Sequence, residues 1–274
     1  MSALDVLADW PVPTVAAAVV GRDGTIAHHG DTTHAFALAS VTKLLVARAV
    51  QVAVEEGAVD LDSEAGPPGS TVQHLLAHAA GYEMTSGKVI AAPGTRRIYS
   101  NHGFTVLAQT LEQATDIPFA DYLRDAVFQP LGMSDTAFDG GAEAAGFGGT
   151  STVDDLAVFA RDLLVPATVS QQMHDRAISV AFEGLDGVLP GFGVQRPNDW
   201  GLGFEIRDGK SPHWTGAANS PRTFGHFGQS GTFLWVDPEA ELALVVLTDR
   251  QFGDWAHEVM PALSDEVLRE FGSD

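Results

Sequence analysis

The chain has 274 residues, of which 45% are hydrophobic and 19% charged, so it can bury a sizeable core as one domain or as a composite of two lobes. It contains no cysteine, which excludes disulfide bonds and thiolate metal sites. The formal net charge of −21 at pH 7 argues against nucleic acid and anionic membranes as partners, because both would be repelled.

The N-terminal segment, residues 1–10, has no cationic stretch before an apolar run, so it does not resemble a secretory signal. All apolar runs are far shorter than the roughly 20 residues that a membrane helix needs. These features predict a cytoplasmic protein without a membrane partner.

The first part of the chain predicts a hairpin followed by a helix. Apolar segments 14–20 and 25–29 flank the turn Gly21-Arg22-Asp23-Gly24, a pattern typical of a β-hairpin. From residue 41 to 56 the apolar residues recur at helical spacing, and Gly57 suits the C-terminal cap.

The middle of the chain, residues 58–165, predicts helical pieces separated by glycine and proline loops. Helical periodicity covers 71–79, 103–114, 118–127 and 150–164, the last beginning near Ser151 as a cap.

After about residue 195 the pattern changes to strands, over 200–207, 222–227, 231–236 and 242–249. An amphipathic helix over 254–271 closes the chain, and Pro261 is expected to kink it or to mark its start.

Strands at both ends with helices between them predict an α/β (α+β) fold, in which an antiparallel sheet flanked by helices is built from both termini. Residues 1–57 and 166–274 would form this lobe, and residues 58–165 an inserted, mostly helical lobe. Ligand sites favour such lobe interfaces.

Ser40-Val41-Thr42-Lys43 is the first candidate for chemistry. A serine hydroxyl is a weak nucleophile until a neighbouring base removes its proton. Residues three apart share a helix face, so the Lys43 amine can reach the Ser40 hydroxyl and act as a base if its pKa is lowered by burial. The alternative is that Ser40 only caps the helix and Lys43 lies on its surface.

Two further motifs follow. In Tyr99-Ser100-Asn101, the tyrosine can relay a proton and the asparagine amide can donate to a substrate carbonyl. His226-Phe227-Gly228 ends a predicted core strand, where the glycine would let a substrate approach closely. The alternatives are a core tyrosine followed by a capping asparagine, and a strand histidine bonded within the core.

In this order the three motifs resemble those of the serine β-lactamase and penicillin-binding-protein superfamily. The resemblance spans about residues 14–270, and a histidine at 226 is most similar to the D-Ala-D-Ala peptidase and class C-like esterase branch. Further segments resemble the family at 36–40, 75–81, 92–101, 128–133 and 225–238.

The resemblance implies a serine hydrolase that forms an acyl-enzyme on Ser40, with Lys43 and Tyr99 sharing the proton. The backbone N–H groups of Ser40 and Gln229 would hold the oxyanion. No cofactor or metal is expected, and the partner would be a small-molecule ester or amide. The implied site comprises catalytic Ser40, Lys43 and Tyr99, with Asn101, His226, Gly228 and Gln229 for substrate and oxyanion binding.

Phe227 departs from the family pattern, because relatives carry there a hydroxyl residue that helps to bind a substrate carboxylate. This departure weakens the case for penicillin or D-Ala-D-Ala recognition. The favoured substrate is therefore a carboxylic ester or a small amide such as a D-amino acid peptide. The alternatives are β-lactam hydrolysis and a catalytically idle binding or sensor domain, against which the intact Ser40, Lys43 and Tyr99 argue.

Other candidate residues favour structural roles. His74 and His78 have the spacing of metal ligands, but no third ligand is evident. Ser230 lacks the glycine spacing of a nucleophile elbow. Three tryptophans either edge the acyl pocket or pack in the core: Trp200, Trp214 and Trp235.

Overall fold

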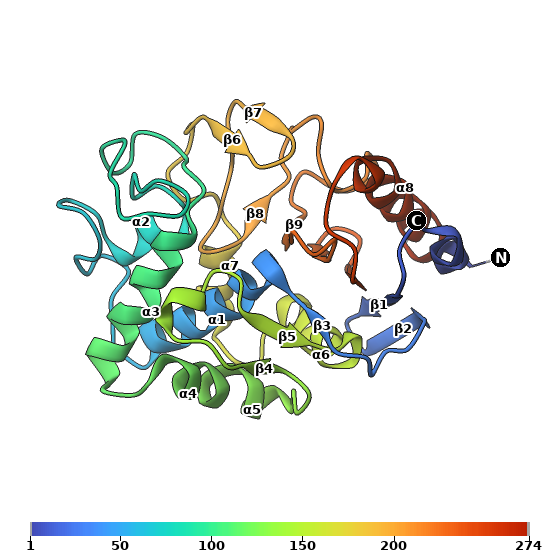
Figure 1. Ribbon diagram of the computed structural model, residues 1–274, viewed down its shortest axis with the longest axis horizontal. Coiled ribbons are helices and arrows are strands. Elements are labelled where there is room, and N and C mark those ends of the chain that lie inside the picture. The colour runs from blue at the N-terminus through green and yellow to red at the C-terminus, as the bar shows by residue number, and fades with distance from the viewer. Residues whose placement is uncertain (1, 273–274) are drawn as a thin grey trace.

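A six-stranded antiparallel sheet organises the molecule, of which the computed structural model describes residues 2–272 (Figure 1). The strand order is β2-β1-β11-β10-β9-β8, with every neighbouring pair antiparallel. Strands from both ends of the chain thus lie side by side, and the predicted fold class is confirmed. The strands are β1 (Val15–Gly21), β2 (Gly24–His29), β8 (Glu205–Ile206), β9 (Phe224–Phe227), β10 (Phe233–Asp237) and β11 (Leu242–Thr248).

Both faces of the central part of this sheet are buried, because β1 and β11 are almost entirely apolar and alternate residues point to opposite faces, whereas the edge strand β2 is largely exposed. Ala16 and Ala18 join the core cluster that includes α1 (Thr42–Glu55) and α6 (Val153–Leu164). Ala17 and Val19 join the second cluster, which includes α8 (Asp254–Phe271) and η1 (Ala3–Asp9). In Figure 1, η1 and α8 lie side by side near the two ends of the chain.

The remaining helices gather around α1, and α3 packs against both α1 and α2 (Figure 1). They are η2 (Ala39–Val41), α2 (Val72–Leu76), α3 (Asn101–Thr115), α4 (Phe119–Leu123), η3 (Arg124–Phe128), α5 (Gln129–Leu131), η4 (Ala142–Ala144) and α7 (Gln171–Ala177).

Two small sheets complete the fold. One has the order β3-β5-β4 and the other is the hairpin β6-β7 at the top of Figure 1. Their strands are β3 (Phe36–Ala37), β4 (Ala137–Phe138), β5 (Gly149–Ser151), β6 (Gly187–Leu189) and β7 (Gly193–Gln195).

The division of the chain at residues 57 and 165 into two lobes stays a prediction. Helix α6 belongs by sequence to the proposed helical insert, yet it packs against β1 and β11 of the large sheet. The sheet and the middle of the chain therefore share one continuous apolar core.

Several predicted boundaries were wrong for local reasons. Helix α6 begins after Thr152, whose side chain accepts a hydrogen bond from the Asp155 N–H, while Ser151 belongs to β5. Only 205–206 of the predicted strand 200–207 is a strand, because Gly203 turns the chain with a φ of 90°. Pro261 lies inside α8 and does not mark its start.

The predicted helix over 71–79 is also too long, since α2 ends at Leu76 and His78 adopts a φ of 53°. Among residues 2–272, no helix combines the length and the apolar character that crossing a bilayer requires.

Candidate active site

Ser40 lies in η2, the short 3₁₀ helix that leads directly into α1. The residue before it, Ala39, has a φ of 45°, a left-handed conformation that costs a non-glycine residue about 1–2 kcal/mol. Neighbouring contacts hold this strained segment in place. The Leu38 N–H donates to the Gly149 carbonyl at 2.9 Å, and the Thr232 hydroxyl donates to the Leu38 carbonyl at 3.0 Å.

Lys43 occupies the first turn of α1, and its side chain is fully buried. Its Nζ lies 3.4 Å from Ser40 Oγ, 2.6 Å from Asn101 Oδ1 and 2.6 Å from the Gly146 carbonyl oxygen. Burial lowers the pKa of Lys43 well below the ordinary value of a lysine, which favours the neutral amine. A neutral amine that donates its two N–H groups to Asn101 and Gly146 keeps its lone pair for the Ser40 proton.

Tyr99 approaches the same hydroxyl from the loop before α3. Its phenol donates a 2.7 Å hydrogen bond to Ser40 Oγ, and its ring lies 4.7 Å from Lys43 Nζ. Burial raises the pKa of Tyr99 despite the opposing effect of the hydrogen bond to Ser40, so the phenol stays protonated at neutral pH. Ser40 Oγ is therefore contacted by a hydrogen-bond donor, Tyr99, and by a potential base, Lys43.

His78 holds the segment that carries Tyr99 and Asn101. Its Nδ1 accepts a 3.1 Å hydrogen bond from the Ser100 N–H, and its ring lies 4.6 Å from the Tyr99 ring. Burial, followed by the charges of neighbouring cations, lowers the pKa of His78 well below its ordinary value, so the ring is neutral. The Asn101 N–H is held in turn by the Met84 carbonyl at 2.7 Å.

His226 lies on β9 and is 3% exposed. Its Nδ1 lies 2.6 Å from the Phe227 carbonyl, which can only accept, so Nδ1 carries the proton and Nε2 carries the lone pair. Burial, with a contribution from the charge of Lys43, lowers the pKa of His226 to about 3. The imidazole is therefore uncharged at neutral pH.

Gly228 and Gln229 form the turn after β9. A Cβ atom at Gly228 would lie 2.6 Å from both the Leu38 carbonyl oxygen and Thr232 Oγ1, so the group that closely approaches this glycine is the Leu38 backbone. The Gln229 side chain donates to the Phe252 carbonyl at 3.3 Å. Within residues 2–272, the Gln229 N–H has no backbone acceptor.

These residues surround a cavity of about 240 Å³ that opens onto Ser40. Tyr99, Asn101, His226 and Gln229 line it, whereas Lys43 lies behind Ser40 and Gly228 is outside the lining. Most of the other residues that line the cavity were not predicted from the sequence. They are Ala39, Met84, Phe147, Leu189, Pro190, Trp200, Glu205 and Phe227.

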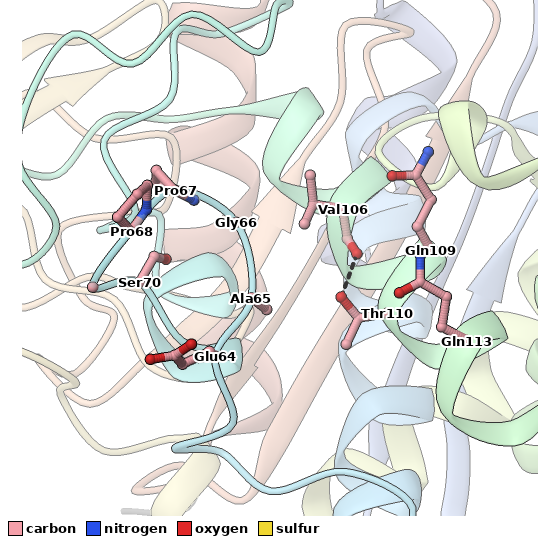
Figure 2. A pocket seen from close by; sticks show the side chains of 11 residues that line it. Glu64, Ala65, Gly66, Pro67, Pro68, Ser70, Val106, Gln109, Thr110 and Gln113 are labelled. Carbon is pink, nitrogen blue, oxygen red and sulfur yellow. Dashed lines mark hydrogen bonds between the residues drawn. The ribbon is translucent and has the colours of Figure 1, made fainter.

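A larger hollow, of about 560 Å³, lies elsewhere, between the loop 64–70 and α3 (Figure 2). Glu64 is the sole titratable residue among the described residues that line it. Figure 2 also shows the Thr110 hydroxyl, which is bonded to the Val106 carbonyl at 2.8 Å. This hollow offers no pairing of a nucleophile with a base, so the smaller cavity at Ser40 is the candidate site.

The other residues considered from the sequence lie outside this cavity, except Trp200, which forms one of its walls. Trp214 and Trp235 are fully buried and donate to Glu205 and Ser264. Ser230 donates to the Ala37 carbonyl at 2.7 Å. Among residues 2–272, no three histidine or acidic side chains are placed to hold a metal ion.

Two groups of the site could not be predicted from the sequence. The Gly146 carbonyl contacts Lys43 through its backbone, which any residue type provides. Glu205 receives hydrogen bonds from Lys210, His213 and Trp214, and its carboxylate is buried at the wall of the cavity.

Known proteins share this fold and sequence. A crystal structure of a beta-lactamase from Mycobacterium bovis is 67% identical, covers 99% of this chain and 100% of its own, and has a TM-score of 0.99. EstCE1, described as a hydrolase with promiscuous acyltransferase activity, is 16% identical with a TM-score of 0.78 over 97% of this chain and 96% of its own. This second likeness shows a common fold alone.

A curated relative from Salmonella heidelberg (strain SL476), provisionally named D-alanyl-D-alanine carboxypeptidase, is 26% identical over 201 residues. The match covers 58% of this chain and 46% of the relative, so the chain spans less than half of that protein's length. A family model described as Beta-lactamase matches residues 7–269. The chain therefore belongs to the beta-lactamase family, as its three motifs predicted.

Proposed function

We propose that the protein is a serine hydrolase that forms an acyl-enzyme on Ser40 and releases it to water. One observation carries the proposal: Ser40 Oγ lies 3.4 Å from the buried amine of Lys43 and 2.7 Å from the phenol of Tyr99. A nucleophile contacted by both a potential base and a proton relay is the arrangement that acyl transfer needs. Membership of the beta-lactamase family supports a hydrolase.

In the proposed reaction, Ser40 Oγ attacks the substrate carbonyl carbon while its proton passes to the neutral Lys43 amine. The N–H groups of Ser40 and Gln229 stabilise the oxyanion, and Asn101 and His226 contact the substrate. The bond from the carbonyl carbon to the leaving group then breaks, and the proton passes by way of Tyr99 to the departing alcohol or amine. Water attacks the acyl-serine ester in the same way, which releases a carboxylic acid and restores the Ser40 hydroxyl.

The proposed substrate is a carboxylic ester or a small amide such as a D-amino acid peptide. Phe227 supports this choice, because its ring packs 5.5 Å from Phe192 and 5.0 Å from Phe252 and brings no hydroxyl to the cavity. β-Lactam hydrolysis is the second candidate, favoured by the name of the Mycobacterium bovis relative. The cytoplasmic location stays a prediction from the sequence.

The test is hydrolysis of p-nitrophenyl butyrate by the wild type and by Ser40→Ala, with a chromogenic cephalosporin assayed alongside. We expect Ser40→Ala to lose about 10⁴-fold or more in kcat, because the remaining groups cannot supply a nucleophile. Lys43→Ala should lose several orders of magnitude. Ser179→Ala is the matched control, since its hydroxyl is bonded to the Asp175 carbonyl outside the cavity, and it should keep its activity.

The two assays separate the candidates. Cleavage of the ester without turnover of the cephalosporin supports the esterase proposal, and efficient turnover of the cephalosporin supports the second candidate. Equal activity in the wild type and Ser40→Ala would remove Ser40 from the mechanism. If neither compound is hydrolysed and mass spectrometry finds no acyl adduct on Ser40, a catalytically idle binding domain is favoured.

A further inference from the structure

The walls of the cavity at Ser40 are mostly apolar. Six large apolar side chains line it: Met84, Phe147, Leu189, Pro190, Trp200 and Phe227. Leu189, Trp200 and Phe227 are buried, while Met84 and Phe147 are 45% and 49% exposed and thus stand where the cavity meets solvent. A substrate chain that enters along these side chains would leave water for an apolar surface, which favours hydrocarbon.

No lysine or arginine is present among the described residues that line the cavity. The amine of Lys43 does not line the cavity; it is fully buried and contacts Asn101 and Gly146. His226, which does line the cavity, has no charge at neutral pH. A substrate carboxylate would therefore enter without a cation to balance its charge, and burying an unpaired charge is strongly unfavourable.

Glu205 makes the cavity still less suited to anions. It is the sole acidic residue among the described lining residues, and its carboxylate is held by Lys210, His213 and Trp214. Those donors are used by Glu205 and are not free to bind a second carboxylate. The formal net charge of −21 adds a field that repels anions from the whole molecule.

The volume gives a measure of the acyl group that the cavity can enclose before the chain reaches solvent at Met84 and Phe147. A cavity of about 240 Å³ holds about eight groups of the size of a water molecule, each occupying about 30 Å³. The reacting carboxyl group and part of the leaving group use some of this space. An acyl chain of about four to six carbons would fill the remainder.

We propose that the site takes uncharged esters with an apolar acyl chain of about four to six carbons and discriminates against acyl groups that end in a carboxylate. This inference rests on the proposed serine hydrolase function. Specificity arises from the apolar walls and from the lack of a balancing cation, so both chain length and charge should control the rate.

The test compares p-nitrophenyl esters of acetate, butyrate, hexanoate and decanoate with the mono-p-nitrophenyl ester of adipate. Adipate matches hexanoate in length but replaces the terminal methyl with a carboxylate. We expect kcat/KM to rise about threefold to fourfold per methylene up to hexanoate and to fall at decanoate. The kcat/KM for the adipate ester should be at least about 100-fold lower than that for the hexanoate ester.

A charge variant sharpens the test. Met84→Lys places a flexible cation at the mouth of the cavity, on an exposed position that tolerates charge, and should raise kcat/KM for adipate at least about tenfold. Val89→Lys is the matched control, because Val89 is 48% exposed on the same loop but does not line the cavity. It changes the net charge equally and should leave the ratio of hexanoate to adipate rates unchanged.

The outcomes distinguish the two proposals. Ser40-dependent cleavage with equal rates on hexanoate and adipate, or with acetate as the best substrate, overturns this inference and leaves the serine hydrolase in place. If Val89→Lys and Met84→Lys raise kcat/KM for the adipate ester equally, the inference is also overturned, because the effect would then come from net charge. Failure of every ester and of the cephalosporin to show Ser40-dependent cleavage, with no acyl adduct on Ser40 by mass spectrometry, contradicts the proposed function itself.

Discussion

The buried amine of Lys43 can accept the Ser40 proton only while it is neutral. Burial lowers the pKa of Lys43, so the neutral form persists to lower pH than in an exposed lysine. We expect kcat/KM for p-nitrophenyl butyrate to be level above this lowered pKa and to fall about tenfold per pH unit below it. The measurement is a pH–rate profile of the wild type.

Two outcomes would contradict this role for Lys43. A midpoint near 10.5, the ordinary lysine value, would mean that the amine is charged at neutral pH. A single fall near pH 3 would assign the dependence to His226, whose pKa is lowered to about that value by burial. Lys88→Met, which removes a lysine outside the site, should reproduce the wild-type profile.

His78 should act as a positioning residue for Tyr99 and Asn101. In His78→Leu the buried Ser100 N–H loses its acceptor, at a cost of about 1–3 kcal/mol in the free energy of unfolding. The displaced Tyr99 should lower kcat by about tenfold to 100-fold with little change in KM. Steady-state kinetics and thermal unfolding measure both effects.

The control for this variant is His74→Leu. His74 contacts the Thr71 hydroxyl at 2.9 Å and makes no hydrogen bond to the segment 99–101. It should therefore keep the wild-type kcat. A wild-type kcat in His78→Leu, at a temperature where it is folded, would exclude the positioning role.

Residue spacing alone predicts which side chains of the candidate site lie close together. Ser40 and Lys43 are three apart, and Tyr99 and Asn101 two apart, so local geometry constrains each pair. The Gly146 carbonyl and the walls at Phe147 and Leu189 could not be predicted, because their positions depend on how distant loops pack and not on residue type.

At the level of elements, the turn after β9 is braced against the segment that precedes Ser40. A Cβ atom in Gly228→Ala would lie 2.6 Å from the Leu38 carbonyl oxygen, so either the turn or the Leu38–Ser40 segment must move. We expect unfolding to become easier by about 1–3 kcal/mol and kcat to fall about 100-fold. Urea unfolding and ester hydrolysis measure these changes.

Gly209→Ala is the matched control, because a Cβ atom there meets no atom within 4 Å. It should keep both stability and kcat. If Gly228→Ala were as stable and as active as Gly209→Ala, the turn would not position Ser40.

The elements that the sequence predicted best are long enough for their apolar residues to repeat several times at strand or helix spacing. The hairpin β1-β2, helix α1 and helix α8 have enough residues for a period of two or 3.6 to be recognised. Strands β3 and β8 have two residues each, which is too few to show any period. Such short strands form because their surroundings supply hydrogen-bond partners, and only the folded chain reveals them.

At the scale of the whole molecule, a buried ion pair joins β8 to the loop that follows it. Glu205 and Lys210 are 1% and 4% exposed, and Lys210 Nζ also donates to the Asp199 carbonyl at 2.7 Å. Although burial alone would raise it, the charges of His213 and Lys210 and their hydrogen bonds lower the pKa of Glu205. The pair therefore stabilises the fold while the carboxylate is ionised.

Replacing either member of this ion pair should lower the free energy of unfolding substantially. We expect Glu205→Gln or Lys210→Met to lower the free energy of unfolding by about 3–5 kcal/mol, because each leaves a buried charge without its partner. The double variant should lose less free energy of unfolding than the two single variants lose together, with a coupling energy of about 1–3 kcal/mol. Urea unfolding of the four proteins at pH 7 measures this cycle, and additive losses would show that the pair is not coupled.

The pH dependence provides an independent check on the same pair. A glutamate whose pKa is lowered on folding contributes stability above its unfolded value of 4.5, and that contribution is lost as the pH falls through the folded pKa. The difference in unfolding free energy between the wild type and Glu205→Gln should therefore be largest near pH 7 and shrink below about 4.5. A difference that stays constant from pH 7 to pH 3 would mean that the charge of Glu205 contributes nothing and that its hydrogen bonds alone stabilise this wall of the cavity.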